Sequence, residues 1–92
     1  MRPDWASAAC AGHGEWFFGP DHEPVSRRNW RESRATAICA PCPLQLACLE
    51  FALAEGFKNG VWGGMTEDGR ANLLRWRRKK ASRDRARERR AA

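Results

Sequence analysis

The sequence has 92 residues and a formal net charge of +6 at pH 7, from 17 Lys and Arg against 11 Asp and Glu. Residues 1–64 hold six basic and seven acidic side chains, whereas residues 65–92 hold eleven basic and four acidic ones. This length excludes a large enzyme with a deep pocket, and the absence of a long apolar run or a recognisable secretory signal leads us to expect a cytoplasmic protein without a membrane span.

Residues 1–24 are predicted to be irregular, because glycines and prolines interrupt the segment and no hydrophobic period is sustained. The segment nevertheless carries Trp5 and the run Trp16-Phe17-Phe18. Such aromatic side chains would form an aggregation-prone hydrophobic patch if they were exposed, so we expect them to pack onto the rest of the domain.

Two helices are predicted next, over residues 26–38 and 43–55. Ser26 suits an N-cap, Pro43 suits the first helical position, and Gly56 suits the residue after the last turn. The second helix has a wide apolar stripe, so we expect it to be well buried. One face of the first helix carries residues spaced i, i+4, i+7 and i+8, namely Trp30, Arg34, Ala37 and Ile38.

A glycine-rich turn with short strands flanking Val61-Trp62 is predicted within residues 57–65. Thr66 suits the N-cap of a third helix. Beyond Arg77 the composition is almost entirely charged residues, Ala and Ser. We therefore expect a domain over residues 1–76 and a basic, flexible tail over residues 77–92.

Four cysteines dominate the candidate chemistry: Cys10, Cys39, Cys42 and Cys48. A domain this small commonly needs a staple, and cytosolic thiols stay reduced and tend to bind metal. Four-thiolate zinc sites usually pair two short C-x2-C knuckles, and only one is present here, so the spacing favours an iron–sulfur cluster. Zinc with the same ligands is the alternative, followed by a disulfide or a redox-active Cys39–Cys42 pair.

The joint pattern of motifs resembles the WhiB-like proteins of actinobacteria and their phages, over roughly residues 4–76. The motifs are the four cysteines in the order Cys10…Cys39-x2-Cys42-x5-Cys48, the turn Gly60-Val61-Trp62-Gly63-Gly64, the segment Glu15-Trp16-Phe17-Phe18-Gly19-Pro20, Asp4-Trp5, and Met65-Thr66-Glu67-Asp68.

This resemblance implies a mainly α-helical fold wrapped around one [4Fe–4S] cluster held by the four cysteines. A cluster with four thiolates carries a charge of about −2, and we expect backbone N–H groups at the start of the 43–55 helix to offset it. Four aromatic residues are expected to cover the cluster: Trp5, Trp16, Phe17 and Phe18. The resemblance also implies a surface for the C-terminal domain of the principal sigma factor of RNA polymerase, for which the candidates are Gly60, Val61, Trp62, Gly63, Gly64, Trp16, Phe17 and Phe18.

The basic tail is predicted to contact the phosphates of promoter DNA. Its candidate residues are Arg75, Arg77, Arg78, Lys79, Lys80, Arg83, Arg85, Arg87, Arg89 and Arg90. The resemblance implies transcriptional regulation that responds to redox state and nitric oxide, with no catalysis and no small-molecule substrate. The alternatives are a zinc-stapled DNA-binding module without a redox role and a protein disulfide reductase in the cluster-free form.

Overall fold

The computed structural model describes residues 3–91, which form three α-helices and two short 3-10 turns. The elements are η1 (Trp5–Ser7), η2 (Gly14–Trp16), α1 (Val25–Cys39), α2 (Gln45–Glu55) and α3 (Glu67–Ala91). In place of the short strands predicted around Val61, one isolated antiparallel bridge joins Trp62 to Met65. The predicted mainly helical fold is confirmed for these residues.

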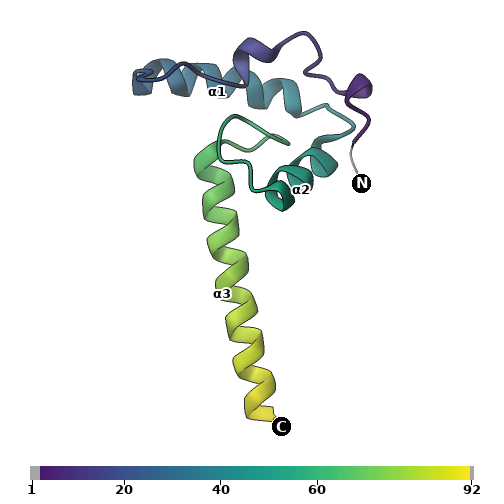
Figure 1. Ribbon diagram of the computed structural model, residues 1–92, viewed down its shortest axis with the longest axis vertical. Helices are drawn as coiled ribbons and strands as arrows, with labels where there is room; N and C mark the ends of the chain where they lie inside the picture. The colour runs from purple at the N-terminus through teal and green to yellow at the C-terminus, as the bar shows by residue number, and fades with distance from the viewer. Residues whose placement is uncertain (1–2, 92) are drawn as a thin grey trace.

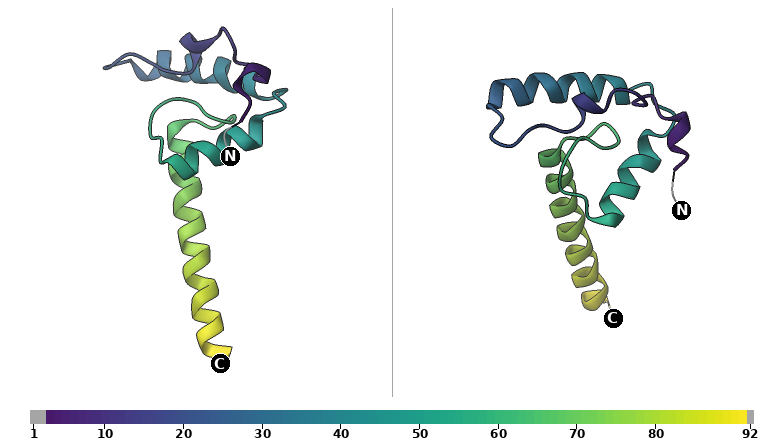
Figure 2. Two further views of the ribbon diagram at one scale, coloured as in Figure 1. Left: turned by 45° about the vertical axis from the view of Figure 1, so that its right-hand side comes forward. Right: turned by 45° about the horizontal axis from the view of Figure 1, so that its top comes forward.

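The helices and the N-terminal segment form a small body from which α3 projects (Figure 1). The N-terminal segment runs alongside α1, as the further views also show (Figure 2). A loop leads from the end of α1 to α2. Since α3 points away from α1, the molecule is elongated, with extents of 53 × 32 × 20 Å.

Helix α1 buries a different face from the one that its apolar spacing suggests. It begins at Val25, with Pro24 as N-cap instead of the predicted Ser26. Its buried residues are Arg31, Ala35 and Cys39, which are spaced four apart, and Glu32, which is next to Arg31. Trp30 is 46% exposed. The buried face differs from this spacing because Arg31 and Glu32 are buried as partners of other charged side chains.

Helix α2 is less buried than its composition suggests. It starts at Gln45, two residues after Pro43, because the Cys42 carbonyl first accepts the Gln45 N–H in a turn (3.2 Å). It ends as predicted at Gly56, whose φ of 73° is left-handed. Ala52 is its one buried residue, since a single side of the helix meets the body.

Helix α3 begins as predicted, with the Thr66 hydroxyl accepting the Gly69 N–H (3.1 Å). It then runs without a break to Ala91, so the expected flexible tail is helical here. Arg, Lys, Ala and Glu are good helix formers, and pairs such as Lys80–Asp84 (3.1 Å) add local support. No helix of the described chain combines the length and apolarity needed to cross a membrane.

The hydrophobic core is very small. Its buried members are Phe17, Ala35, Cys39 and Val61, with Cys10, Trp16 and Ile38 packed against them. Two of these seven residues are cysteines, so the core and the candidate metal ligands occupy the same place.

Candidate metal centre

The four cysteines lie around one cavity of about 340 Å³ whose lining is almost entirely apolar. Cys10 comes from the N-terminal segment, Cys39 from the last residue of α1, Cys42 from the following loop and Cys48 from α2. All four thiols are free. The structure therefore brings together four sulfurs from segments that are up to 38 positions apart in the sequence.

Backbone N–H groups reach three of the four sulfurs. The Ala9 N–H donates to Cys42 Sγ (3.4 Å). Burial raises the pKa of the Cys39 and Cys48 thiols, and hydrogen bonds from the backbone of Gly64 and Gly63, respectively, partly oppose that rise. The donors thus come from the N-terminal segment and the glycine turn, not from the start of α2 as expected, because that helix begins three residues after Cys42.

The glycine turn, Gly60-Val61-Trp62-Gly63-Gly64, packs closely against α2. Gly63 has a φ of 58°, and a Cβ added there would lie 2.5 Å from the Gln45 carbonyl oxygen and 2.5 Å from Leu49 Cβ. At Gly64, an added Cβ would lie 2.6 Å from Gln45 Nε2. These glycines allow the turn to approach closely enough for its N–H groups to reach the cysteines.

The other end of the turn is fixed by the aromatic segment. The Val61 N–H donates to the Phe17 carbonyl (2.9 Å), and a Cβ added at Gly60 would lie 2.5 Å from Phe18 Cε1. Gly60, Val61 and Gly63 are buried, so three of the five turn residues predicted to contact a sigma factor are interior in this structure.

An aromatic surface surrounds Trp62, which lines the cavity together with Trp5 and Phe18. The Trp62 ring lies 6.1 Å from Trp5, 6.1 Å from Phe18 and 5.0 Å from Phe57, measured between ring centroids. Its Nε1 donates to the Asn59 carbonyl (2.9 Å). Phe18 is 52% exposed and Phe57 is 39% exposed. We call Trp5, Phe18, Phe51, Phe57 and Trp62 the aromatic surface.

Three of the four residues predicted to cover the centre line the cavity: Trp5, Phe17 and Phe18. Trp16 does not line it. Its ring packs against Trp30, with centroids 5.3 Å apart, and against the buried core.

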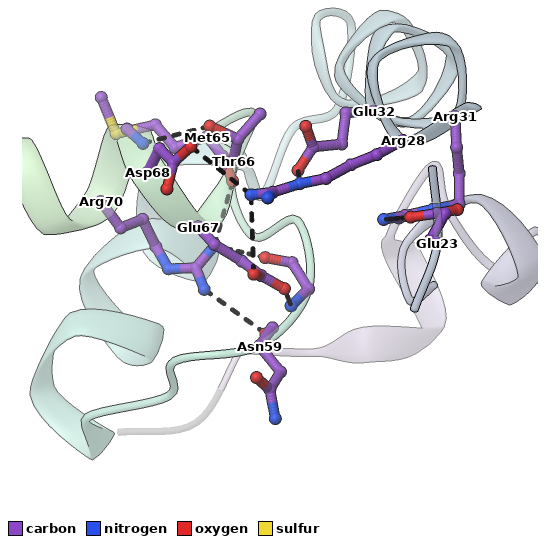
Figure 3. A network of polar contacts seen from close by, with 12 residues as sticks. Glu23, Arg28, Arg31, Glu32, Asn59, Met65, Thr66, Glu67, Asp68 and Arg70 are labelled. Atoms are coloured by element: carbon purple, nitrogen blue, oxygen red, sulfur yellow. Dashed lines mark hydrogen bonds and ion pairs between the residues drawn. The ribbon is translucent and has the colours of Figure 1, made fainter. Parts of the chain in front are cut away.

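Arg70 is the main connection between α3 and the turn, a role that no sequence pattern predicts. Its guanidinium donates to the carbonyls of Gly60 (2.6 Å), Met65 (3.1 Å), Phe57 and Asn59 (both 3.4 Å), as Figure 3 shows in part. The side chain is only 3% exposed. Burial lowers the pKa of Arg70, and the neighbouring Glu67 carboxylate partly restores it.

A second buried arginine attaches the N-terminal segment to α1. Arg31 forms a two-pronged ion pair with Glu23, with both N–O distances 2.9 Å, and donates to the Trp16 carbonyl (3.1 Å). Its hydrogen bond lowers the pKa of the Glu23 carboxyl. This pair, also drawn in Figure 3, was missed because buried charges leave no signal in a hydrophobic period.

The basic residues predicted to bind DNA all lie on α3 and are exposed. Three of them have partners within the described chain. Arg77 pairs with Glu50 of α2 (2.8 Å) and Lys80 pairs with Asp84, while Arg75 donates to Asn72. Arg77 therefore also attaches α3 to the body.

Comparison with known proteins agrees with the motif pattern. The family model described as "Transcription factor WhiB" matches residues 5–73. The transcriptional regulator WhiD of Streptomyces coelicolor is 42% identical over 73 residues, which cover 77% of this chain and 65% of that protein.

Two further relatives carry names that include a response to redox state. The redox-responsive transcriptional regulator WhiB3 of Mycolicibacterium smegmatis is 40% identical over 74 residues, covering 78% of this chain and 77% of that protein. The redox- and pH-responsive transcriptional regulator WhiB3 of Mycobacterium tuberculosis is 46% identical over 67 residues, covering 72% and 66%. The chain thus spans about two thirds to three quarters of the length of these relatives.

Proposed function

Because the chain belongs to the WhiB family of transcription factors, we propose that it is a regulator responsive to redox state and nitric oxide that holds one [4Fe–4S] cluster. We further propose that it binds the C-terminal domain of the principal sigma factor and promoter DNA. The observation that carries the proposal is the convergence of four free thiols on one apolar cavity. The relatives are named as regulators, which agrees with a protein that is not an enzyme.

The residues around the cavity fit a cluster better than a single zinc ion. Zinc draws four thiolates to about 2.3 Å from one point. The cavity that the four cysteines help to line has a volume of about 340 Å³, roughly ten times the ~30 Å³ share of one water molecule. Backbone N–H groups directed at Cys39, Cys42 and Cys48 are the donors that stabilise thiolate sulfur in iron–sulfur sites.

When bound, a [4Fe–4S] cluster supplies an oxidant-sensitive link among the segments that carry its ligands. The protein's own links between these segments are few. The N-terminal segment is held to α1 chiefly by the Glu23–Arg31 pair, and the turn is held to α3 by Arg70. With so small a core, loss of the cysteine link should loosen the aromatic surface, part of which lines the cavity.

The aromatic surface is the candidate site for the sigma factor. Aromatic residues are enriched among the residues that dominate binding energy at protein interfaces, and Phe18 and Phe57 are exposed here. The buried glycines and Val61 act indirectly, since they set the position of Trp62. The exposed basic residues of α3 are the candidate contacts to DNA, and they provide affinity without an evident base-reading pattern.

The cluster is tested by purification under nitrogen followed by iron, sulfide and zinc analysis. We expect about four irons and four sulfides per chain, with absorbance near ~400 nm. Cys10→Ser should lose most of the iron, whereas the neighbouring exposed Ala11→Ser should keep it. One zinc and no sulfide would favour the zinc-stapled alternative, and thiol–disulfide turnover that depends on Cys39 and Cys42 would favour the reductase.

The sigma-factor surface is tested by co-purification with the C-terminal domain of the principal sigma factor. Phe18→Ala should weaken that complex at least tenfold, the loss typical of an interface hot spot. Trp76→Ala is the matched control, because Trp76 is an exposed aromatic residue on α3 (57% exposed) outside the aromatic surface. Equal loss in both variants would contradict the assignment.

A further inference from the structure

The outer face of α1 carries a groove that is separate from the cysteine cavity. The groove has a volume of about 460 Å³, and its lining residues are Trp16, Trp30, Ser33, Arg34, Ala37 and Ile38. None of these residues lines the cysteine cavity. The groove therefore belongs to neither the proposed metal centre nor the aromatic surface.

Two arginines lie over the tryptophan rings on this face, and one of them, Arg34, lines the groove. The Arg34 guanidinium carbon lies 5.1 Å from the Trp16 ring centroid and 4.9 Å from that of Trp30. The corresponding atom of Arg27 lies 5.6 Å from the Trp30 centroid. Cation–π contacts of this kind fix the guanidinium plane and leave its N–H edge free to donate.

Neither arginine has a carboxylate partner within residues 3–91. The ion pairs of α1 in that range are made by Arg28 and Arg31. Arg27 and Arg34 are seven residues apart, which is two helical turns or about 10 Å along the axis. The face thus presents two cations over the half-exposed Trp30, with Arg34 in the lining of the groove and Arg27 beside it.

We propose that this α1 face is a second protein-docking surface, and that its partner is an acidic segment with an apolar anchor. The anchor fills the groove beside Trp16 and Trp30. Two carboxylates of the partner receive the N–H edges of Arg27 and Arg34. Buried Trp and Arg side chains are the types most enriched among residues that dominate interface energetics.

A protein partner fits this face better than a nucleic acid. Binding of single-stranded nucleic acid relies on bases that stack on free aromatic faces. Here the guanidinium groups already lie over the rings of Trp16 and Trp30, so a base would have to displace them. A carboxylate leaves these contacts intact and uses the bidentate geometry that guanidinium groups favour.

The test is selection of peptides from a random 16-residue display library on the full chain, with counter-selection on an Arg27→Gln/Arg34→Gln double variant. The counter-selection removes peptides that bind the aromatic surface or α3. We expect the survivors to carry two acidic residues flanking an apolar one. A representative survivor should bind the double variant and Trp30→Ala at least about tenfold more weakly, and Arg85→Gln, an exposed α3 control, with unchanged affinity.

Salt should weaken that binding several-fold between 50 and 500 mM, because exposed charges are screened. Survivors without acidic residues, or equal affinity for the double variant, would overturn the proposal. A single-stranded oligonucleotide of 20 thymidines tests whether the face binds nucleic acid. Binding of this oligonucleotide that is lost in the double variant but kept in Arg85→Gln would assign the face to nucleic acid instead.

Discussion

Substitution of Gly63 tests whether the glycine turn exists to pack against α2. At its φ of 58°, an alanine costs about 1–2 kcal/mol for the left-handed backbone. The new Cβ would also lie 2.5 Å from three atoms of α2, two of them backbone atoms of Gln45 and Leu49 that cannot easily move. Overpacking of this kind costs a further ~1–3 kcal/mol.

Gly63→Ala should therefore destabilise the chain by about 2–5 kcal/mol, out of a total stability of ~5–15 kcal/mol typical of small domains. Each ~1 kcal/mol lowers the midpoint of thermal unfolding by about 4–8 °C at this size. The assay is thermal unfolding of anaerobically purified protein, followed by circular dichroism. Since the Gly63 N–H also reaches Cys48, iron content should fall in parallel.

Gly56→Ala and Gly14→Ala separate the cost of the left-handed backbone from the cost of overpacking against α2. Gly56 has a similar φ of 73° with nothing within 4 Å of an added Cβ, so it reports the backbone cost alone. Gly14 has open space and no left-handed φ, so alanine there should change little. If Gly63→Ala were no less stable than Gly56→Ala, the close approach to α2 would not be what requires glycine.

Three further predictions concern charged residues. Arg70→Met should destabilise the chain by about 1–3 kcal/mol in urea unfolding, because it leaves the buried Gly60 carbonyl without its donor; the exposed Arg85→Met should change it by less than ~0.5 kcal/mol. The pKa of Glu23 is lowered from its ordinary value near 4.5 by Arg31, so its stabilisation is complete above pH 4.5 and is lost as the pH falls through the lowered pKa. Glu23→Gln should flatten the fall in melting temperature below pH 4.5, and an unchanged acid profile would contradict this reasoning. The last concerns three tail arginines at helical spacing, Arg83, Arg87 and Arg90. Their joint replacement by Gln should reduce the slope of log K against log[salt] for promoter DNA by about 3, and a filter-binding series in which the slope stays the same would rule out phosphate contacts at these positions.

Spacing and turn chemistry predicted much of this structure from the sequence. The three helices, the cap at Thr66 and the left-handed Gly56 follow from local rules that involve a few neighbouring residues. The resemblance to the WhiB family, carried by the cysteines and the Gly-Val-Trp-Gly-Gly turn, is confirmed by the match over residues 5–73. The helices and caps could be predicted because each is encoded in one short stretch of chain, and the family because its motifs can be recognised from residue types and spacing alone.

The features that were missed depend on contacts between distant residues. Arg70 and Arg31 are charged residues inside helices, where a hydrophobic period assigns them to solvent, yet each is buried by acceptors from another segment. Helicity beyond Arg77 was underestimated because charge density was interpreted as flexibility, although the residues themselves favour helix.

Because α3 is one uninterrupted helix, the directions in which its basic side chains point around the helix axis are fixed relative to the body. Each residue of a helix turns the chain by 100° and advances it by about 1.5 Å. Deleting one residue after Arg77 would swing every following arginine around the axis, whereas deleting seven would nearly restore the original azimuth and shorten the reach by about 10 Å. The number of residues between the body and each arginine therefore sets the direction in which that arginine points relative to the body.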